Sequence, residues 1–175
     1  MVAILLFKVW LDGLGIPGVD TLLMFAPFGI LFTIFATVGV VNAFNLIDGL
    51  NGLSSYVTVS VAVSLSIIAF QAGNSQVSTF LVLVVAAVLG FMVLNFPLGK
   101  IFLGDGGAYA LGHLLVWSAI ILINGVTEVS AFAILLVFFW PVADTGLALW
   151  RRWKLGTPAD RPDRLHFHQL AMRFL

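Results

Sequence analysis

Residues 22–53 read LLMFAPFGILFTIFATVGVVNAFNLIDGLNGL, an apolar run that ends in asparagines, an aspartate and glycines. The run is long enough to cross a bilayer, whose hydrocarbon core needs about 20 apolar residues per helix. Polar groups at the end of such a helix are costly unless they have partners, so they usually mark a site. The stretch therefore predicts a membrane helix with a polar site at its end.

The composition of the whole chain extends this prediction. Of its 175 residues, 61% are hydrophobic and 9% are charged, which lies far outside the range of soluble globular domains. The formal net charge of +0 gives no reason to expect nucleic acid as a partner, and the absence of cysteine excludes disulfides and thiolate metal sites. Lys8 lies inside the first apolar stretch rather than ahead of it, so residues 1–11 are interpreted as a truncated span or a surface hairpin and not as a signal peptide.

Five stretches are apolar and close enough to the length of a bilayer span to predict five transmembrane helices. They occupy residues 22–42, 54–70, 77–94, 108–123 and 129–150. The fold expected from them is all-α, a polytopic integral membrane helix bundle in which residues 1–175 form a single membrane domain. Residues 151–175 follow the last span as a basic cytoplasmic segment that contains His166 and His168.

The basic residues indicate how the bundle is oriented. If the five spans alternate in direction, seven of the eight lysines and arginines fall on one side of the membrane, and only Lys8 falls on the other. By the positive-inside rule, the side with the larger number is cytoplasmic. Three polar clusters also fall on that side, within residues 42–53, 95–107 and 161–169, so we expect one site on the cytoplasmic face.

The first cluster places Asn42, Asn45 and Asp48 at a spacing of three, so on a helix they follow one face. Gly49 and Gly52 then loosen the helix end and let the backbone approach a ligand. On a functional interpretation, Asp48 is a metal ligand, a base or a carboxylate beside a phosphate, and the asparagines donate amide hydrogen bonds. The alternative is an ordinary helix end, where Asn, Asp and Gly are common. The depth of Asn42 in the apolar run favours the functional interpretation.

The second cluster, NFPLGKIFLGDGGA at residues 95–108, combines a helix break with a polar turn. Asp105 lies just before the next predicted span, where glycines expose backbone N–H groups and a helix N-terminus favours anions. Lys100 adds a charge suited to phosphate, and a carboxylate in this setting suits Mg²⁺ that bridges the protein to diphosphate oxygens. The alternative is that Asp105 only caps the helix above a glycine turn.

The third cluster, RPDRLHFHQ at residues 161–169, brings Arg164 close to His166 and His168. The spacing of the two histidines suits a loop or a strand, and binding of a diphosphate by histidine and arginine is the favoured interpretation. Basic and aromatic residues just after a span, at 151–154, are instead typical of anchors at anionic lipid headgroups. That explanation covers the start of the segment but not the histidines.

Two further polar residues lie inside predicted spans. Asp144, in the last span, is either a site residue or a structural carboxylate that pairs with an arginine or caps a kink at Pro141. His113, in the fourth span, is interpreted as a residue that forms a hydrogen bond to another helix.

In this order and on one face, the motifs NAFNLIDGLNGL, KIFLGDGG and RPDRLHFH resemble those of the polyprenyl-phosphate N-acetylhexosamine-1-phosphate transferases, the family that includes the phospho-MurNAc-pentapeptide translocases. The third motif is closer to the branch that uses UDP-GlcNAc or a related sugar. The resemblance implies a membrane enzyme that transfers N-acetylhexosamine-1-phosphate, in the first instance GlcNAc-1-phosphate, from a UDP-sugar to polyprenyl (undecaprenyl) phosphate and releases UMP. Such an enzyme serves the synthesis of cell-wall or lipopolysaccharide precursors at the cytoplasmic face of the bacterial inner membrane.

The resemblance also implies a cofactor, partners and roles for the site residues. The cofactor is Mg²⁺, with Mn²⁺ as an alternative, and Asp105 is its ligand. The partners are a UDP-N-acetylhexosamine and the polyprenyl phosphate lipid, in a membrane and without nucleic acid, and a homodimer is compatible with the family. The catalytic residues are Asp48, Asp105, His166 and His168, and the substrate-binding residues are Asn42, Asn45, Lys100 and Arg164.

The sequence departs from the family pattern at three points. Asn51 replaces an aspartate in the first motif, and Gln169 replaces a histidine after the third. A pair of aspartates that the family carries on an earlier helix has no counterpart, and much of the expected length is missing. The chain is therefore expected to be a central or C-terminal fragment, or a degenerate copy, of such an enzyme.

Two other functions stay open at this point. A secondary transporter or channel would use Asp48, His113 and Asp144 as an ion relay near the midplane, with access from both faces. The crowding of the polar clusters on one face argues against it. The other alternative is a non-catalytic membrane fragment that only assembles with further subunits.

Overall fold

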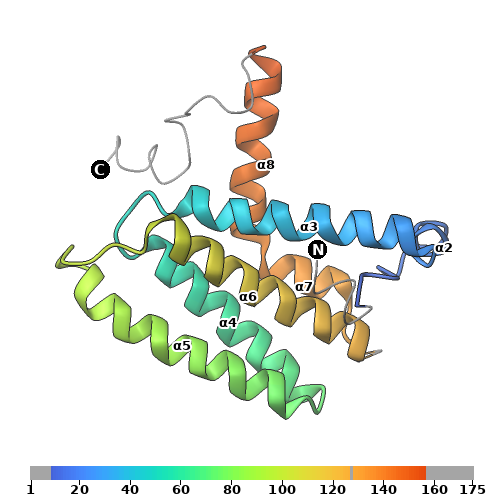
Figure 1. Ribbon diagram of the computed structural model, residues 1–175, viewed down its shortest axis with the longest axis horizontal. Helices are drawn as coiled ribbons and strands as arrows, with labels where there is room; N and C mark the ends of the chain where they lie inside the picture. The colour runs from blue at the N-terminus through green and yellow to red at the C-terminus, as the bar shows by residue number, and fades with distance from the viewer. Residues whose placement is uncertain (1–8, 127, 157–175) are drawn as a thin grey trace.

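The computed structural model describes residues 9–126 and 128–156, and every regular element within them is an α-helix (Figure 1). The helices are α2 (Val19–Leu23), α3 (Ala26–Ile47), α4 (Leu53–Gln71), α5 (Ser75–Asn95), α6 (Gly104–Gly125), α7 (Ala131–Val137) and α8 (Phe139–Lys154). This arrangement confirms the prediction of an all-α membrane helix bundle.

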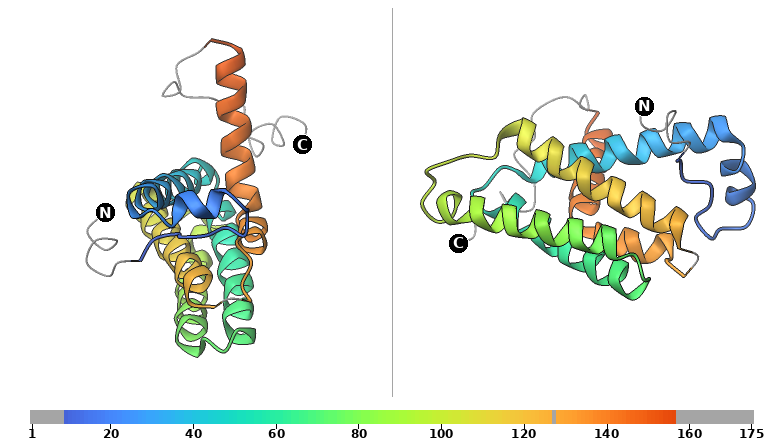
Figure 2. Two further views of the ribbon diagram at one scale, coloured as in Figure 1. Left: turned by 90° about the vertical axis from the view of Figure 1, so that its right-hand side faces the viewer. Right: turned by 60° about the horizontal axis from the view of Figure 1, so that its bottom comes forward.

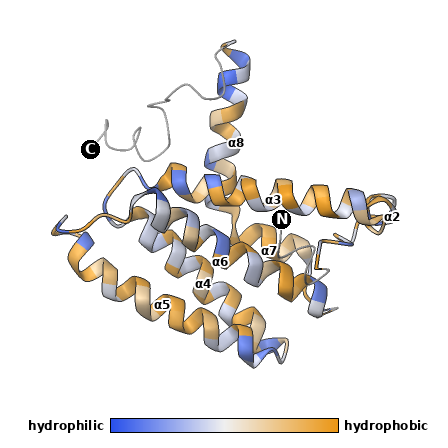
Figure 3. Cartoon of the chain, viewed as in Figure 1, coloured by the Kyte–Doolittle hydropathy of each residue, from blue (hydrophilic) through white to orange (hydrophobic). Residues whose placement is uncertain are grey.

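Four of these helices, α3 to α6, are long and apolar enough to cross a bilayer. Their outer surfaces carry large hydrophobic side chains, such as Phe35 and Leu83, which are 73% and 63% exposed. Figure 3 shows that apolar residues extend along the full length of these helices. An exposed apolar surface of this extent is unfavourable in water and is suited to contact with lipid. The predicted spans 54–70, 77–94 and 108–123 lie inside α4, α5 and α6.

The first long helix begins and ends later than the predicted span 22–42. The short helix α2 ends at Leu23, and α3 begins at Ala26 with Pro27 in its first turn. A proline is tolerated there because the first N–H groups of a helix have no partner within it. Since α3 continues to Ile47, the whole of Asn42 to Asn45 lies inside the helix.

The predicted fifth span, residues 129–150, forms two helices, α7 and α8, whose directions differ by 78°. Pro141 lies in the first turn of α8, and its ring would clash with the carbonyl of Val137, the last residue of α7, if the helix continued. Phe138 at the break is buried and packs edge-on against Phe44 of α3, with 6.3 Å between ring centroids. As a result α8 leaves the bundle at a steep angle (Figure 2). Passage of residues 129–150 through the membrane as one span stays a prediction.

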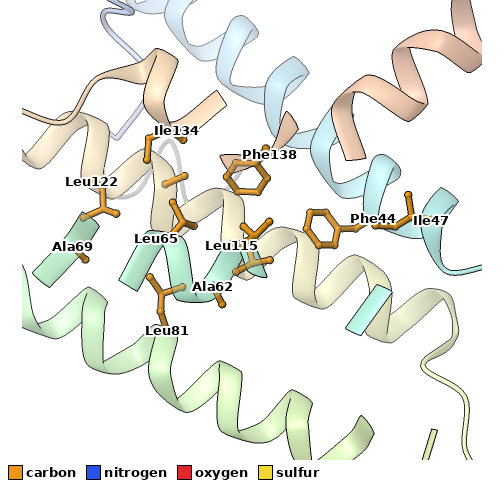
Figure 4. Packing of buried hydrophobic residues seen from close by; sticks show 12 residues of the cluster. Phe44, Ile47, Ala62, Leu65, Ala69, Leu81, Leu115, Leu122, Ile134 and Phe138 are labelled. Carbon is orange, nitrogen blue, oxygen red and sulfur yellow. The ribbon is translucent and has the colours of Figure 1, made fainter. Parts of the chain in front are cut away.

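The four long helices pack in pairs, α4 along α5 and α3 along α6, and α4 also contacts α6. Gly112 permits the close approach of α3 to α6, because a Cβ atom at this position would lie 3.1 Å from the Cα atom of Val41. The shared core is apolar (Figure 4). Its largest side chains include Phe44, Ile47, Leu65, Leu81, Leu115, Leu122 and Phe138. This packing holds the end of α3 beside the start of α6.

Candidate active site

Two of the three predicted polar clusters lie at one end of the bundle (Figure 1). α3 ends and α4 begins around residues 48–52, and α5 ends and α6 begins around residues 96–103. We call these two segments the site-end loops. The α4–α5 turn, residues 72–74, lies at the opposite end. The third predicted cluster, with Arg164, His166 and His168, lies outside the described residues.

The first and second clusters are joined by a hydrogen bond between side chains. The Nδ2 group of Asn45, in the last turn of α3, donates to Oδ1 of Asp105, in the first turn of α6, at 2.9 Å. Asp105 is exposed and Asn45 is half-buried. The bond fixes one oxygen of the Asp105 carboxylate while the side chain stays accessible from outside the bundle.

Asp48 lies next to this pair, directly after the last residue of α3. Burial raises the pKa of its carboxyl above the ordinary value, and the negative charge of Asp105 raises it further. The buried hydroxyl of Ser54, at the start of α4, lowers the pKa of Asp48 and so opposes these two effects. The Ser54 oxygen itself is buried and forms no close hydrogen bond. The charge of Asp105 therefore acts on the carboxyl group of Asp48.

Asn95 is a residue of this site to which the sequence analysis assigned no role. It is the last residue of α5 and is only 4% exposed. Its Oδ1 atom accepts a hydrogen bond from the backbone N–H of Gly52 at 2.7 Å, and its Nδ2 group donates to the carbonyl of Ile101 at 2.8 Å. One side chain thus bonds both site-end loops. The only signal in the sequence is an amide residue at the end of an apolar span, just before Phe96 and Pro97.

Gly52 is required where the first loop meets the second. Its φ angle of +86° lies in the left-handed region that favours glycine. A Cβ atom at this position would lie 2.9 Å from Cγ of Phe96, too close for the ring to stay in place. Phe96 in turn packs edge-on against Tyr56 of α4, with 6.3 Å between ring centroids. The sequence predicted that this glycine lets the backbone approach a ligand. In the structure, the backbone at Gly52 approaches the side chain of Phe96.

Asn42 borders a cavity that neither Asp48 nor Asp105 lines. It is exposed and lines a cavity of about 200 Å³ formed by α3 and α6, together with Thr37, His113 and Trp117. The His113 ring lies near that of Trp117, at 6.1 Å between centroids. The sequence predicted a hydrogen bond from His113 to another helix, but none is present within residues 9–126 and 128–156. The role of Asn42 in substrate binding stays a prediction.

Two other predicted residues differ in their distance from the site. Lys100 is exposed in the site-end loop 96–103, and its backbone N–H donates to the carbonyl of Leu94 at 3.0 Å, which folds the loop back onto α5. Asp144 is buried on α8 and does not lie in the site-end loops.

A separate cavity of about 290 Å³ next to α7 is lined by apolar residues such as Phe32, Ile120 and Phe138, and none of the predicted site residues lines it.

The carboxylates of the site suit one mode of metal binding. Among the described residues, no group of three or more acidic, histidine or cysteine side chains could hold a metal ion. Asp48 and Asp105 instead provide a pair of carboxylates. Mg²⁺ is commonly held by one or two carboxylates, with water and substrate phosphates as its other ligands. The pair therefore fits Mg²⁺ bound together with a phosphate-containing substrate.

Comparison with known proteins places these residues in a family context. A family model described as Glycosyl transferase family 4 matches residues 1–123, which include both site-end loops. The undecaprenyl-phosphate alpha-N-acetylglucosaminyl 1-phosphate transferase of Escherichia coli K12 is 30% identical over 171 residues, which is 95% of this chain and 47% of that protein.

Two further relatives show the same pattern of coverage. The protein of the same name from Salmonella typhi is 32% identical over 182 residues, or 99% of this chain and 48% of that protein. The probable undecaprenyl-phosphate N-acetylglucosaminyl 1-phosphate transferase of Bacillus subtilis is 34% identical over 143 residues, or 81% of this chain and 40% of that protein. The chain thus spans about half the length of the curated relatives it matches.

Proposed function

The chain belongs to glycosyl transferase family 4, and on this premise we propose that it transfers an N-acetylhexosamine-1-phosphate, in the first instance GlcNAc-1-phosphate, from a UDP-sugar to undecaprenyl phosphate and releases UMP. Membership confirms the family that the three motifs had indicated. The relatives from Escherichia coli and Bacillus subtilis are named for GlcNAc-1-phosphate transfer with undecaprenyl phosphate, which supports the choice of sugar and lipid.

One observation carries the proposal for this chain. The hydrogen bond between Asn45 and Asp105 joins residues that are 60 positions apart in the sequence. It brings the two asparagine- and aspartate-containing motifs into a single polar site with Asp48, at the end of helices that are otherwise apolar. Neither motif on its own distinguishes a functional site from an ordinary helix end. A carboxylate pair brought together from the ends of two helices is suited to binding a metal ion or a substrate.

The chemistry of the transfer explains what these residues would do. A phosphate oxygen of the lipid attacks the β-phosphorus of the UDP-sugar, the bond from that phosphorus to the bridging oxygen breaks, and UMP leaves. Both reactants are anionic, so the site has to position them and offset their charge. Asp105 and Asp48 would hold Mg²⁺, which when bound offsets negative charge on the phosphate oxygens. Asn45 keeps the Asp105 carboxylate in one orientation. Because the lipid phosphate is already largely ionised at neutral pH, a strong base is not required.

The orientation predicted from the basic residues supports a cytoplasmic site in the bacterial inner membrane. The predicted topology puts seven of the eight basic residues on the side of the site-end loops. Nucleotide sugars are cytosolic, whereas the lipid phosphate reaches the same interface by lateral diffusion in the bilayer. A site at the membrane end of four helices meets both substrates.

The experiment measures UMP release from UDP-GlcNAc by membranes that contain this chain, with undecaprenyl phosphate and with Mg²⁺, Mn²⁺ or EDTA. We expect release that depends on the metal and falls about 100-fold or more in Asp105→Asn, because the substitution removes the charge but keeps an oxygen that can accept from Asn45. The matched control is Asp20→Asn in α2, the short helix that precedes α3, where the carboxylate accepts from the N–H of Leu14 at 2.7 Å. The control should retain its activity.

Two outcomes would contradict the proposal. Metal-dependent release that is unchanged in Asp105→Asn would reject the metal assignment. Absence of UMP release from both UDP-GlcNAc and UDP-GalNAc by the unmodified chain would reject a transferase activity of this polypeptide and favour the non-catalytic alternative.

A further inference from the structure

We infer that Asn95 is a positioning residue for the transfer: its buried side chain sets the separation of the two site-end loops and thereby of Asp48 and Asp105. The inference rests on the proposed function for its catalytic consequence. Its structural part stands on the hydrogen bonds of Asn95 alone.

The side chain of Asn95 forms hydrogen bonds to both site-end loops. Asn95 bonds the backbone of Gly52 in one site-end loop and the backbone of Ile101 in the other. Both bonded groups belong to the backbone, so they constrain the course of each loop rather than the orientation of a side chain. The two bonds use the acceptor and the donor of the amide, a combination that aspartate, serine or alanine does not reproduce in the same shape.

The groups that Asn95 bonds lie near the two carboxylates in the sequence. Gly52 closes the loop that begins at Asp48, and Ile101 lies shortly before Asp105 in the other loop. The bond from Asn45 to Asp105 is a second side-chain tie at this end of the bundle, and it joins α3 to α6. Asn95 therefore controls the two loops from inside the protein, whereas Asn45 acts at the exposed surface of the site.

The site-end loops fit closely around Asn95. The carbonyl of Asn95 accepts from the N–H of Gly99 at 2.8 Å, so the loop turns back over the end of α5. Phe96 then covers Gly52. Removing the Asn95 side chain would leave the N–H of Gly52 and the carbonyl of Ile101 without their partner in a buried setting. The loops would move apart or admit water to satisfy these groups.

The test measures the separation of the loops directly. The chain contains no cysteine, so spin labels can be placed at Gly49→Cys and Phe102→Cys without competing sites. Both positions are exposed, one in each site-end loop. Pulsed electron paramagnetic resonance then gives the distribution of distances between the labels in detergent or nanodiscs, with helical content and thermal unfolding recorded on the same samples.

We expect Asn95→Ala to broaden this distribution or to shift its mean, because both loops are released. Asn95→Asp should give an intermediate distribution, since its carboxylate accepts from Gly52 but has no N–H to donate to Ile101. The matched control is Asn74→Ala at the other end of α5, which removes one side-chain bond to the N–H of Val77 and should leave the distance unchanged. A folded Asn95→Ala or Asn95→Asp protein with the original distribution would overturn the inference.

Kinetics on the same variants link the distance to the reaction. Turnover at saturating UDP-GlcNAc should fall about 10- to 100-fold in Asn95→Ala, because small displacements of catalytic groups have effects of this size. Asn74→Ala should keep its turnover even if it lowers the unfolding temperature to the same extent. If both asparagine variants lose turnover in proportion to their loss of stability, a positioning role is rejected. If the unmodified chain has no transferase activity, the proposed function fails, while the distance measurement still decides whether Asn95 holds the loops.

Discussion

The two ends of the helix pair α4–α5 are both closed with the help of an asparagine, but the bonds of the two residues differ in range. At the α4–α5 turn, Asn74 accepts from the N–H of Val77 in the helix that it caps. At the site end, Asn95 accepts from Gly52, 43 positions earlier in the sequence. The turn is thus stabilised by its own neighbours, whereas the site end depends on segments that only folding brings together.

The same contrast holds for the surroundings of the two ends. Near the turn, Ser66 of α4 and Ser78 of α5 bond each other across a short stretch of chain, with their oxygens 3.1 Å apart. At the site end, Asn45 of α3 bonds Asp105 of α6. A helix hairpin can form from one continuous segment, but the carboxylate pair requires all four long helices to be in place. Substitutions at the two ends are therefore expected to have unequal effects.

The largest difference should come from alanine in place of a glycine at each end. Gly52 and Gly73 both have positive φ angles, +86° and +74°, but only Gly52 faces a side chain, that of Phe96. We expect Gly73→Ala to cost about 1–2 kcal/mol for the left-handed backbone, and Gly52→Ala about 2–5 kcal/mol because displacement of Phe96 adds to this. Unfolding in mixed detergent micelles measures both values. Equal losses would mean that the site end is no more tightly constrained than the turn.

An effect of intermediate size is expected from the charge of Asp48. Its pKa is raised in the folded protein, chiefly by burial, so the folded state binds the proton more tightly than the unfolded state. The resulting contribution to stability is fully present below the ordinary aspartate pKa and is lost as the pH rises through the higher pKa of the folded protein. Unfolding of the unmodified protein should therefore become harder as the pH falls from 7 towards 4.

Asp48→Asn removes this titration and provides the comparison. The variant should resist unfolding more strongly than the unmodified protein at pH 7, and the difference should shrink at low pH, as thermal unfolding at several pH values will show. Its UMP release should nevertheless fall, because the site loses a carboxylate. Unfolding curves of the two proteins that stay parallel from pH 4 to 7 would contradict the assigned state of Asp48.

The smallest difference is expected within α4. Ser66→Ala breaks the bond to Ser78 on α5 and should cost about 0.6 kcal/mol, the average for hydrogen bonds between membrane helices. Ser64→Ala removes only a bond to the carbonyl of Ser60 in the same helix and should have almost no effect. The two variants are compared by unfolding in micelles. A larger loss for Ser64→Ala would show that contact between the helices is not what stabilises this hairpin.

Much of the fold was predictable because it depends on local composition. Apolar runs of bilayer length located α4, α5 and α6 within a few residues. The bend between α7 and α8 has a visible cause in Pro141, yet hydropathy alone merged the two helices into one stretch. The end of α3 was placed too early, because the predicted span stopped at Asn42, the first polar residue after the apolar run, whereas the helix continues to Ile47.

The candidate site was predictable in part. Residue type and position singled out Asn45, Asp48 and Asp105, which the structure brings together. The same reasoning grouped Asn42 with them; in the structure Asn42 lines a cavity with His113, and its role in substrate binding stays a prediction. Asn95 received no role, because a single amide at the end of a span has the same appearance whether it faces solvent or bonds two distant loops.

By itself, the sequence determined that the chain is a membrane helix bundle with polar groups at one end. Each segment must be long enough to cross the bilayer and must keep its polar groups out of the lipid, and both conditions can be checked segment by segment. The sequence also determined the family, through motifs whose order survives without any structure. Only the tertiary structure decided which polar groups meet. The pairing of Asn45 with Asp105 and the two bonds of Asn95 depend on how closely α3 packs on α6 and α4 on α5. Such distances arise from the packing of all four helices at once, so no single segment encodes them.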